Sequence, residues 1–252
     1  PAILNARTRP LHLAVWEHME FSDSTRRFRN RDLTVNGLSL CLFTGGADKL
    51  RGLGLALGGN SFNSRMAGLQ LAGLGAAAGQ VCGAQVSGLG NFAGRRLKGV
   101  QLAGLANVVE GPGSGMQASL LADVTDGGFK GIQLAGLATV VDGGSTGLQV
   151  AGLAAVADEG SVGIQAAGLA SVVDGGFTGA QSAGLVSVVD GGFKGMQAAG
   201  LVNVTDGEAY GAQVAGLVNV AGSSLRGFQL GVFNVAEKVR GVQIGLVNVA
   251  ED

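Results

Sequence analysis

The chain has 252 residues, of which 46% are hydrophobic and 14% charged, and its formal net charge is −1. Its 47 glycines follow no Gly-x-y triplet and it has only 3 prolines, which excludes collagen and proline-rich disorder. Because charges are so sparse, we expect self-association or membrane contact and no nucleic-acid partner. No apolar run reaches the length of a membrane-spanning helix.

The first 36 residues differ from everything after them. Leu11–Trp16 alternates like a strand, and Thr34–Phe43 is expected either to pair with it or to begin the first coil of a repeat. An open repeat end exposes strand edges and core, so residues 1–36 are predicted to form an N-terminal capping segment.

Two small clusters lie within this segment. Arg26–Arg31 is basic with one aromatic residue, which is typical of a solvated loop; contact with an anionic lipid or an acidic partner is the functional alternative. His12, Glu17, His18 and Glu20 lie too close together on an expected strand for a catalytic triad or a zinc motif.

Residues 37–252 are predicted to be a repeat domain. A Gly-x-Gln motif recurs with a spacing of 16 residues almost throughout, and degenerate copies begin at Gly37 and Gly52. About fourteen coils of 14–16 residues are counted in this way, which is the signature of a solenoid. The motif places glutamines at Gln70, Gln85, Gln101, Gln117, Gln133, Gln149, Gln165, Gln181, Gln197, Gln213, Gln229 and Gln243.

One unit, from Phe129 to Gly144, shows how such a coil would close. Period-2 alternation fits extended chain, and the paired glycines interrupt any helix. Bends near Ala135–Gly136 and near Thr139 would turn the large apolar residues into one narrow core, with Asp142–Gly144 closing the coil. The side chains expected inside are Ile132, Leu134, Leu137 and Val140. The column headed by Ile132 varies in size, as in a core packed by compensation.

Repeated amides are explained by stacking. Parallel coils about 4.8 Å apart place identical side chains directly above one another, where each amide can bond to the next. We therefore predict a structural ladder of Gln101, Gln117, Gln133, Gln149, Gln165, Gln181, Gln197, Gln213, Gln229 and Gln243. A second polar column contains Asn107, Asp123, Thr139, Ser171, Ser187, Asn203, Asn219, Asn234 and Asn248.

A column of carboxylates follows the glutamine column along the chain. Aspartate before glycine favours turns, and that is the first interpretation. The alternative is a row of calcium sites, which predicts calcium-dependent stability. The candidate residues are Asp126, Asp142, Asp158, Asp174, Asp190 and Asp206.

An antiparallel transmembrane β-barrel is the alternative architecture. Each unit would be one strand, with Ile132, Leu134, Ala138 and Val140 facing lipid. One Trp and one Tyr in the whole chain argue against it, because such barrels carry aromatic girdles at both interfaces.

Catalysis is not expected. The repeats hold no histidine, their carboxylates share one column, and no phosphate-binding loop is present. Cys41 and Cys82 lie at different phases of the repeat and are expected to be buried and too far apart to bridge. We predict no enzyme activity, no cofactor and no resident metal cluster.

The motifs resemble one known family. Gly241–Ala250, the Gly-x-Gln-x-Ala-Gly-Leu copies, Pro10–Val15 and Asn36–Leu40 are similar to the bacterial surface-repeat proteins, over nearly the whole chain. The resemblance implies an exported protein of a bacterium with an outer membrane, and no general enzymatic activity. The chain departs from the family pattern in its Asp-Gly-Gly turns and in lacking the segment that often follows the repeats.

Together these observations predict an all-β solenoid that acts as a structural or scaffold protein of a bacterial envelope or extracellular assembly. It would pack laterally through flat Gly/Ala-rich faces or end to end, with protein partners or other copies of itself. The expected location is the cell surface, or the outer membrane and periplasm. The outer-membrane barrel and a calcium- or ligand-binding surface array are the alternatives.

Overall fold

The computed structural model describes residues 7–16 and 33–251, and every regular element within them is a β-strand. The Arg26–Arg31 cluster and Glu17, His18 and Glu20 lie outside the described residues. The chain divides into two compact units, residues 1–125 and residues 126–252. They are described separately below.

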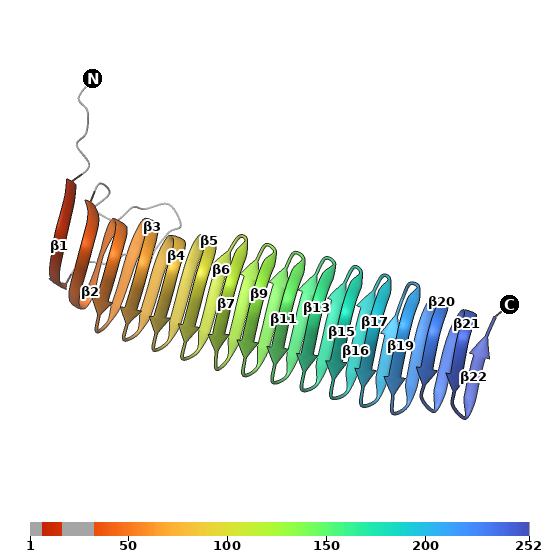
Figure 1. Ribbon diagram of the computed structural model, residues 1–252. Helices are drawn as coiled ribbons and strands as arrows, with labels where there is room; N and C mark the ends of the chain where they lie inside the picture. Colours follow the sequence, from red (N-terminus) through yellow and green to blue (C-terminus); the bar gives the residue numbers. More distant parts are fainter. Residues whose placement is uncertain (1–6, 17–32, 252) are drawn as a thin grey trace, which may run out of the picture. The chain divides into compact units, whose positions relative to one another are not determined.

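The first unit begins with long strands that continue around much of each coil and ends with the shorter strands β6 to β8 (Figure 1). Leu11–Trp16 and Thr34–Phe43 do pair, in parallel, with Arg7 opposite Leu33 and Leu13 opposite Leu40. The strands of this unit are β1 (Arg7–Trp16), β2 (Leu33–Ala56), β3 (Gly59–Ala72), β4 (Gly75–Ser87), β5 (Gly90–Ala103), β6 (Ala106–Glu110), β7 (Gly113–Ser119) and β8 (Ala122–Asp126).

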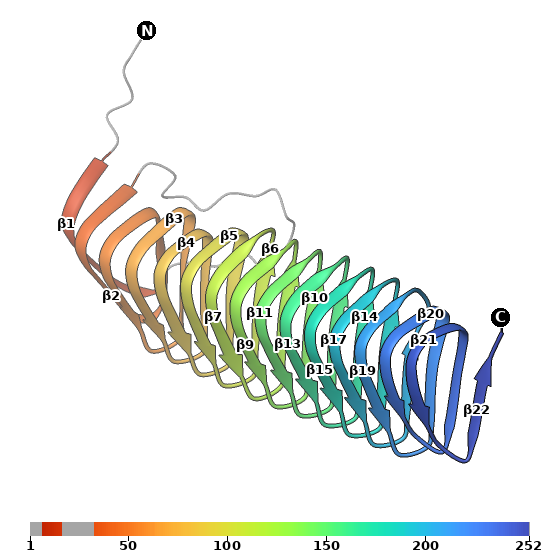
Figure 2. The same cartoon turned by 45° about the vertical axis from the view of Figure 1, so that its right-hand side comes forward.

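The second unit alternates a longer and a shorter strand in each coil, and Figure 2 separates the two. Odd-numbered strands from β9 to β19 pair with one another in parallel, and even-numbered strands from β10 to β20 do the same. The strands are β9 (Phe129–Ala135), β10 (Ala138–Asp142), β11 (Ser145–Ala151), β12 (Ala154–Asp158), β13 (Ser161–Ala167), β14 (Ala170–Asp174), β15 (Phe177–Ala183), β16 (Val186–Asp190), β17 (Phe193–Ala199), β18 (Val202–Thr205), β19 (Ala209–Ala215), β20 (Val218–Leu230), β21 (Phe233–Ile244) and β22 (Val247–Ala250).

The register confirms the solenoid. Gln149 lies opposite Gln133 and Gln165, one coil before and one coil after, and equivalent residues pair in the same way through both units. The chain makes about thirteen turns with coils of about 16 residues. The antiparallel alternative is wrong, because neighbouring strands run in the same direction.

The predicted division between inside and outside is wrong. Ile132 and Leu137 are 40% and 43% exposed, and Leu134 and Val140 are half-buried on the outer side. The inward positions are instead Phe129, Gln133, Ala135, Thr139 and Val141. A turn follows Ala135 as predicted, whereas Thr139 lies inside β10 and makes no bend. Hydrophobicity did not predict the inward positions, because the buried amides form hydrogen bonds with their neighbours in adjacent coils.

The core of the second unit is narrow and only partly aromatic. Phe177 and Phe193 stack with ring centroids 6.1 Å apart and parallel planes, packed with Val173 and Val189. The column that varies in size inside the solenoid is therefore the one headed by Phe129, and the column headed by Ile132 faces outward. Its members are Phe129, Ser145, Ser161, Phe177, Phe193, Ala209 and Leu225.

Candidate functional site

The glutamine ladder is present and lies inside the solenoid. Within each unit, every Gln of the ladder after the first donates from Nε2 to the Oε1 of the Gln one coil earlier, and all but Gln243 are buried. In the first unit the donor–acceptor distances are 2.9 Å for Gln85–Gln70, 2.8 Å for Gln101–Gln85 and 3.1 Å for Gln117–Gln101. In the second unit they are 3.1 Å for Gln149–Gln133, 3.3 Å for Gln165–Gln149, 3.0 Å for Gln181–Gln165, 3.1 Å for Gln197–Gln181, 2.8 Å for Gln213–Gln197, 2.7 Å for Gln229–Gln213 and 2.8 Å for Gln243–Gln229.

These amides also tie the two sides of each coil together. Gln181, on β15, donates to the backbone oxygens of Ser171 on β14 and Val188 on β16, at 3.2 and 3.3 Å. The Ser171 hydroxyl in turn donates to Gln165 Oε1 at 2.8 Å. Buried amides satisfied at both ends stabilise a single packing arrangement, so this ladder is structural.

The second polar column forms ladders of opposite direction. Asn203 donates to Asn219 at 3.0 Å, and Asn219 donates to Asn234 at 2.9 Å, so the donors point toward the C-terminus. In the glutamine ladder they point toward the N-terminus. The two rows of amide dipoles therefore oppose one another within the same core. The sequence predicted both columns and gave no signal of their direction.

In the first unit the asparagine ladder has an aspartate, Asp123, at its C-terminal end. Asn91 donates to Asn107 at 2.9 Å, and Asn107 donates to Asp123 at 2.8 Å. Asp123 is fully buried. A carboxyl group therefore takes the place that an amide holds in the preceding coils.

The aspartate column stacks in register at exposed turns. Asp142, Asp158, Asp174 and Asp190 lie opposite one another in successive coils, each at the end of a short strand. Within residues 7–16 and 33–251, no group of three or more His, Cys, Asp or Glu gathers where it could hold a metal ion. The calcium interpretation therefore depends on the repeated turn alone and stays a prediction.

The outer side of the short strands carries two columns of aliphatic side chains, followed by the Asp column at the strand ends. On β10, β12, β14, β16 and β18 the residues of these two columns are alanine or valine, all half-buried by their neighbours, whereas the inward residues include hydroxyls and an amide. We call this surface the valine face. It consists of Ala138, Val140, Ala154, Val156, Ala170, Val172, Val186, Val188, Val202 and Val204.

A row of exposed leucines borders the valine face. One leucine lies at the turn before each short strand, with 40–46% of its side chain exposed. The row consists of Leu137, Leu153, Leu169, Leu185, Leu201 and Leu217. The Asp column lies at the opposite edge of the same strands, so charge is confined to one border of this surface.

The outer side of the long strands in the second unit is mixed. Lys130, Lys194 and Arg226 share one column there, and the Arg226 guanidinium lies 5.0 Å from the centre of the Tyr210 ring. A hydrogen bond with Glu208 raises the pKa of the Tyr210 phenol. This surface therefore offers polar groups to solvent, unlike the valine face.

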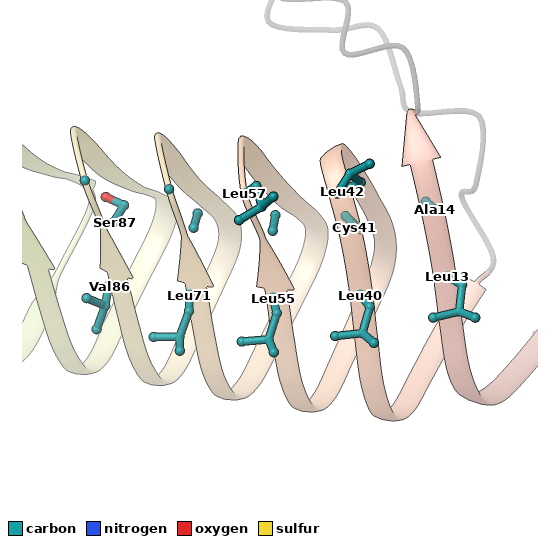
Figure 3. A pocket seen from close by; sticks show the side chains of 14 residues that line it. Leu13, Ala14, Leu40, Cys41, Leu42, Leu55, Leu57, Leu71, Val86 and Ser87 are labelled. Carbon is teal, nitrogen blue, oxygen red and sulfur yellow. The ribbon is translucent and has the colours of Figure 1, made fainter.

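An apolar groove of about 950 Å³ lies over the outer side of the first unit. Leucines from successive coils line it in a row, and Figure 3 shows Leu13, Leu40, Leu55 and Leu71 side by side with Val86. Leu42 and Leu57 lie beyond this row.

One described cysteine and the described histidine share a neighbour, the Ser39 hydroxyl. Cys41 is buried as predicted, with its Sγ atom 3.9 Å from Ser39 Oγ, whereas Cys82 is partly exposed and its Sγ accepts a hydrogen bond from Arg65 at 3.4 Å. His12 is buried with its Nδ1 atom 3.2 Å from the Ser39 hydroxyl.

Two further results bear on classification. Within the part of the chain that the structure describes, no helix has the length and apolar character needed to cross a membrane. Comparison with known proteins finds no matching protein family, no matching curated protein and no matching solved structure.

Proposed function

We propose that this chain is a non-enzymatic structural component of a bacterial envelope or extracellular assembly, exported to the cell surface or to the outer membrane and periplasm. One observation carries the proposal: polar side chains point into the solenoid, while the valine face points outward. A surface of this kind is expected to be covered, because parallel sheets in proteins are normally buried on both sides.

The arrangement of functional groups supports a role without catalysis. An active site brings unlike groups together, whereas this solenoid presents like groups in rows, with amides on one row and carboxylates on another. Sparse charge of both signs also gives no basis for nucleic-acid binding. The bacterial location follows from the resemblance of the repeats to surface-repeat proteins.

Cell fractionation of a bacterium that produces the protein tests this proposal. We expect the chain in the envelope or extracellular fraction, in assemblies that remain large after gentle, detergent-free extraction. A dispersed protein found only in the cytosolic fraction would overturn both parts of the proposal.

The stacked aspartates favour a second candidate, a calcium-binding surface array. If calcium binds the native turns, stability rises by about 2.7 kcal/mol when free calcium is 100 times the dissociation constant. Thermal unfolding in calcium, in magnesium and after chelation measures this effect. An identical midpoint in all three conditions would remove calcium from the function.

A further inference from the structure

We infer that the valine face is the contact surface for a second copy of this chain, which packs on it face to face. This inference deepens the proposed scaffold function and rests on it. On the short strands β10, β12, β14, β16 and β18, the two outward columns before the terminal Asp column contain only alanine and valine, although the inward columns contain Thr139, Ser171, Ser187 and Asn203. A sheet exposed to water normally shows the reverse pattern.

The surface is also flat. Only alanine and valine occupy the two columns, and equivalent residues stack in register from coil to coil, as with Val156, Val172 and Val188. Sheets with such faces pack about 10 Å apart with their side chains in contact. The outward side of the long strands is less suited, since Lys130, Lys194 and Ser182 interrupt it and its apolar residues vary in size.

The available area is sufficient for a weak dimer. Strands of five residues are about 17 Å long including the Asp column, and β10, β12, β14 and β16 with the four-residue β18 and the start of β20 span about 29 Å at the usual spacing. Each copy would therefore cover about 500 Å², or about 1,000 Å² in total, which is near the lower limit for a specific interface. The bordering leucine row adds apolar area at one edge.

The charged border selects the orientation of the second copy. The Asp column lies at one edge of the face and the leucine row at the other. A two-fold axis along the stacking direction places the two Asp columns at opposite edges, each beside the partner's leucines. The perpendicular in-plane axis would place the two columns along the same edge, about 10 Å apart, where like charges repel. We therefore expect short strands of the two copies to run antiparallel across the interface.

Sedimentation velocity of the full chain without detergent, from about 1 to about 200 µM, tests this inference at the affinity that a small interface allows. The wild-type chain should form a concentration-dependent dimer. Val172→Lys, in the middle of the face, should raise the dimer Kd by at least about 100-fold, because it buries an uncompensated charge in each copy. Val172→Thr keeps the shape, adds a hydroxyl and should weaken the dimer less.

Ile164→Lys is the matched control, since Ile164 is an outward residue of β13, on the other side of the solenoid, and is 54% exposed. It should leave the dimer Kd within about 3-fold, and circular dichroism should show all three variants folded. If Ile164→Lys abolishes association while Val172→Lys does not, copies still assemble but the valine face is not the interface.

A wild-type chain that stays monomeric at every concentration would overturn the inference. Flotation with vesicles of phosphatidylcholine and phosphatidylglycerol then identifies the other occupant: binding that Val172→Lys removes would assign the face to lipid. The proposed location in the envelope is tested separately by fractionation and would survive either of these two outcomes.

Discussion

The two units of this chain have the same kinds of inward columns and differ in how their coils close. In the first unit strands β2 to β5 are 13–24 residues long and pass through one corner without a break. Their pairing shifts register between Ala47 and Lys49 and between Ala78 and Gln80. In the second unit, from β9 to β19, strands of 7 residues alternate with strands of 5 or 4 residues, and their pairs keep register throughout.

The turn sequence explains this difference. Asp142–Gly144 and similar turns end short strands in the second unit, because glycine after aspartate adopts a positive φ, 115° at Gly143 and 122° at Gly191. Strand β5 of the first unit has Ala93–Leu97 at the equivalent place, and the strand continues there. The long strand β20 also lacks the Asp-Gly-Gly turn, and its pairing with β21 shifts register after Ala221. The turn sequence therefore determines whether a strand ends and whether neighbouring coils keep register, while the inward columns determine which side chains form the core.

A positive-φ glycine inside the longer strands should be equally indispensable in both units. Gly163 has φ of +133°, and a Cβ atom there would lie 2.0 Å from the backbone oxygen of Gly147. Gly83 in the first unit is equivalent, with φ of +138° and a distance of 2.0 Å to Gly68. Strain and overpacking together make Gly163→Ala or Gly83→Ala cost on the order of 4 kcal/mol or more, measured by urea unfolding.

Gly192→Ala is the control for this prediction. Gly192 lies in the closing turn without a positive φ, and its nearest neighbour would be 3.8 Å from the new Cβ atom. We expect a change within about 1 kcal/mol. Equal losses of unfolding free energy for Gly163→Ala and Gly192→Ala would show that the Gly163 position tolerates a side chain.

The aromatic pair distinguishes the second unit, whose core column also contains serines. Phe193 is 1% exposed and stacks on Phe177, so Phe193→Ala should cost about 3–5 kcal/mol in thermal or chemical unfolding. Phe92→Ala in the first unit removes an outward ring that is 38% exposed, and its effect should be about 1 kcal/mol or less. A loss at Phe193 no larger than that at Phe92 would mean that the serine-containing coils close around the cavity.

Interrupting the glutamine ladder should lower the free energy of unfolding less than removing the Phe193 ring from the core. Gln165→Leu removes the bonds that Gln165 makes with the amides of Gln149 and Gln181 and with the hydroxyl of Ser171, while Gln181 keeps its bonds to backbone oxygens. We expect a loss of about 2–3 kcal/mol, because each of these groups is buried. Gln243→Leu changes a partly exposed rung, so water can replace the lost bond and the loss should stay below about 1 kcal/mol. Equal losses would indicate that the ladder bonds contribute little.

The sequence predicted the period, the parallel stacking and the glutamine ladder, because identical side chains at a fixed spacing must lie above one another. It did not predict which columns face inward. Ile132 and Leu137 are more apolar than Gln133 and Thr139, and hydrophobicity alone places the first pair inside. Stacking reverses this order, since a Gln buried between two other Gln residues makes in the core the bonds it would otherwise make to water.

The sequence also did not predict where the register between coils shifts, or in which direction the amides of each ladder donate. Between Phe62 and Met66 the first unit accommodates an extra residue relative to the next coil, and nothing in the local composition marks it. The opposite directions of the Gln and Asn ladders depend on which backbone oxygens lie across the core, as where Asn203 donates to Val214 at 2.7 Å. Such contacts join residues 11 positions apart and exist only once the coil has closed.

The smallest effect should come from the coil in which a glutamate, Glu159, adopts a positive φ in the closing turn. Glu159 has φ of +75° at the column where Gly143 and Gly175 adopt a positive φ. Glu159→Gly should stabilise the chain by about 0.5–1 kcal/mol, since relief of the left-handed strain exceeds the extra entropy of glycine in the unfolded chain. Glu159→Gln separates this cause from charge, because it removes the repulsion from Asp158 and keeps the strained backbone. If both variants stabilise equally in thermal unfolding, charge and not backbone conformation distinguishes this coil, and the effect should then fade at high salt.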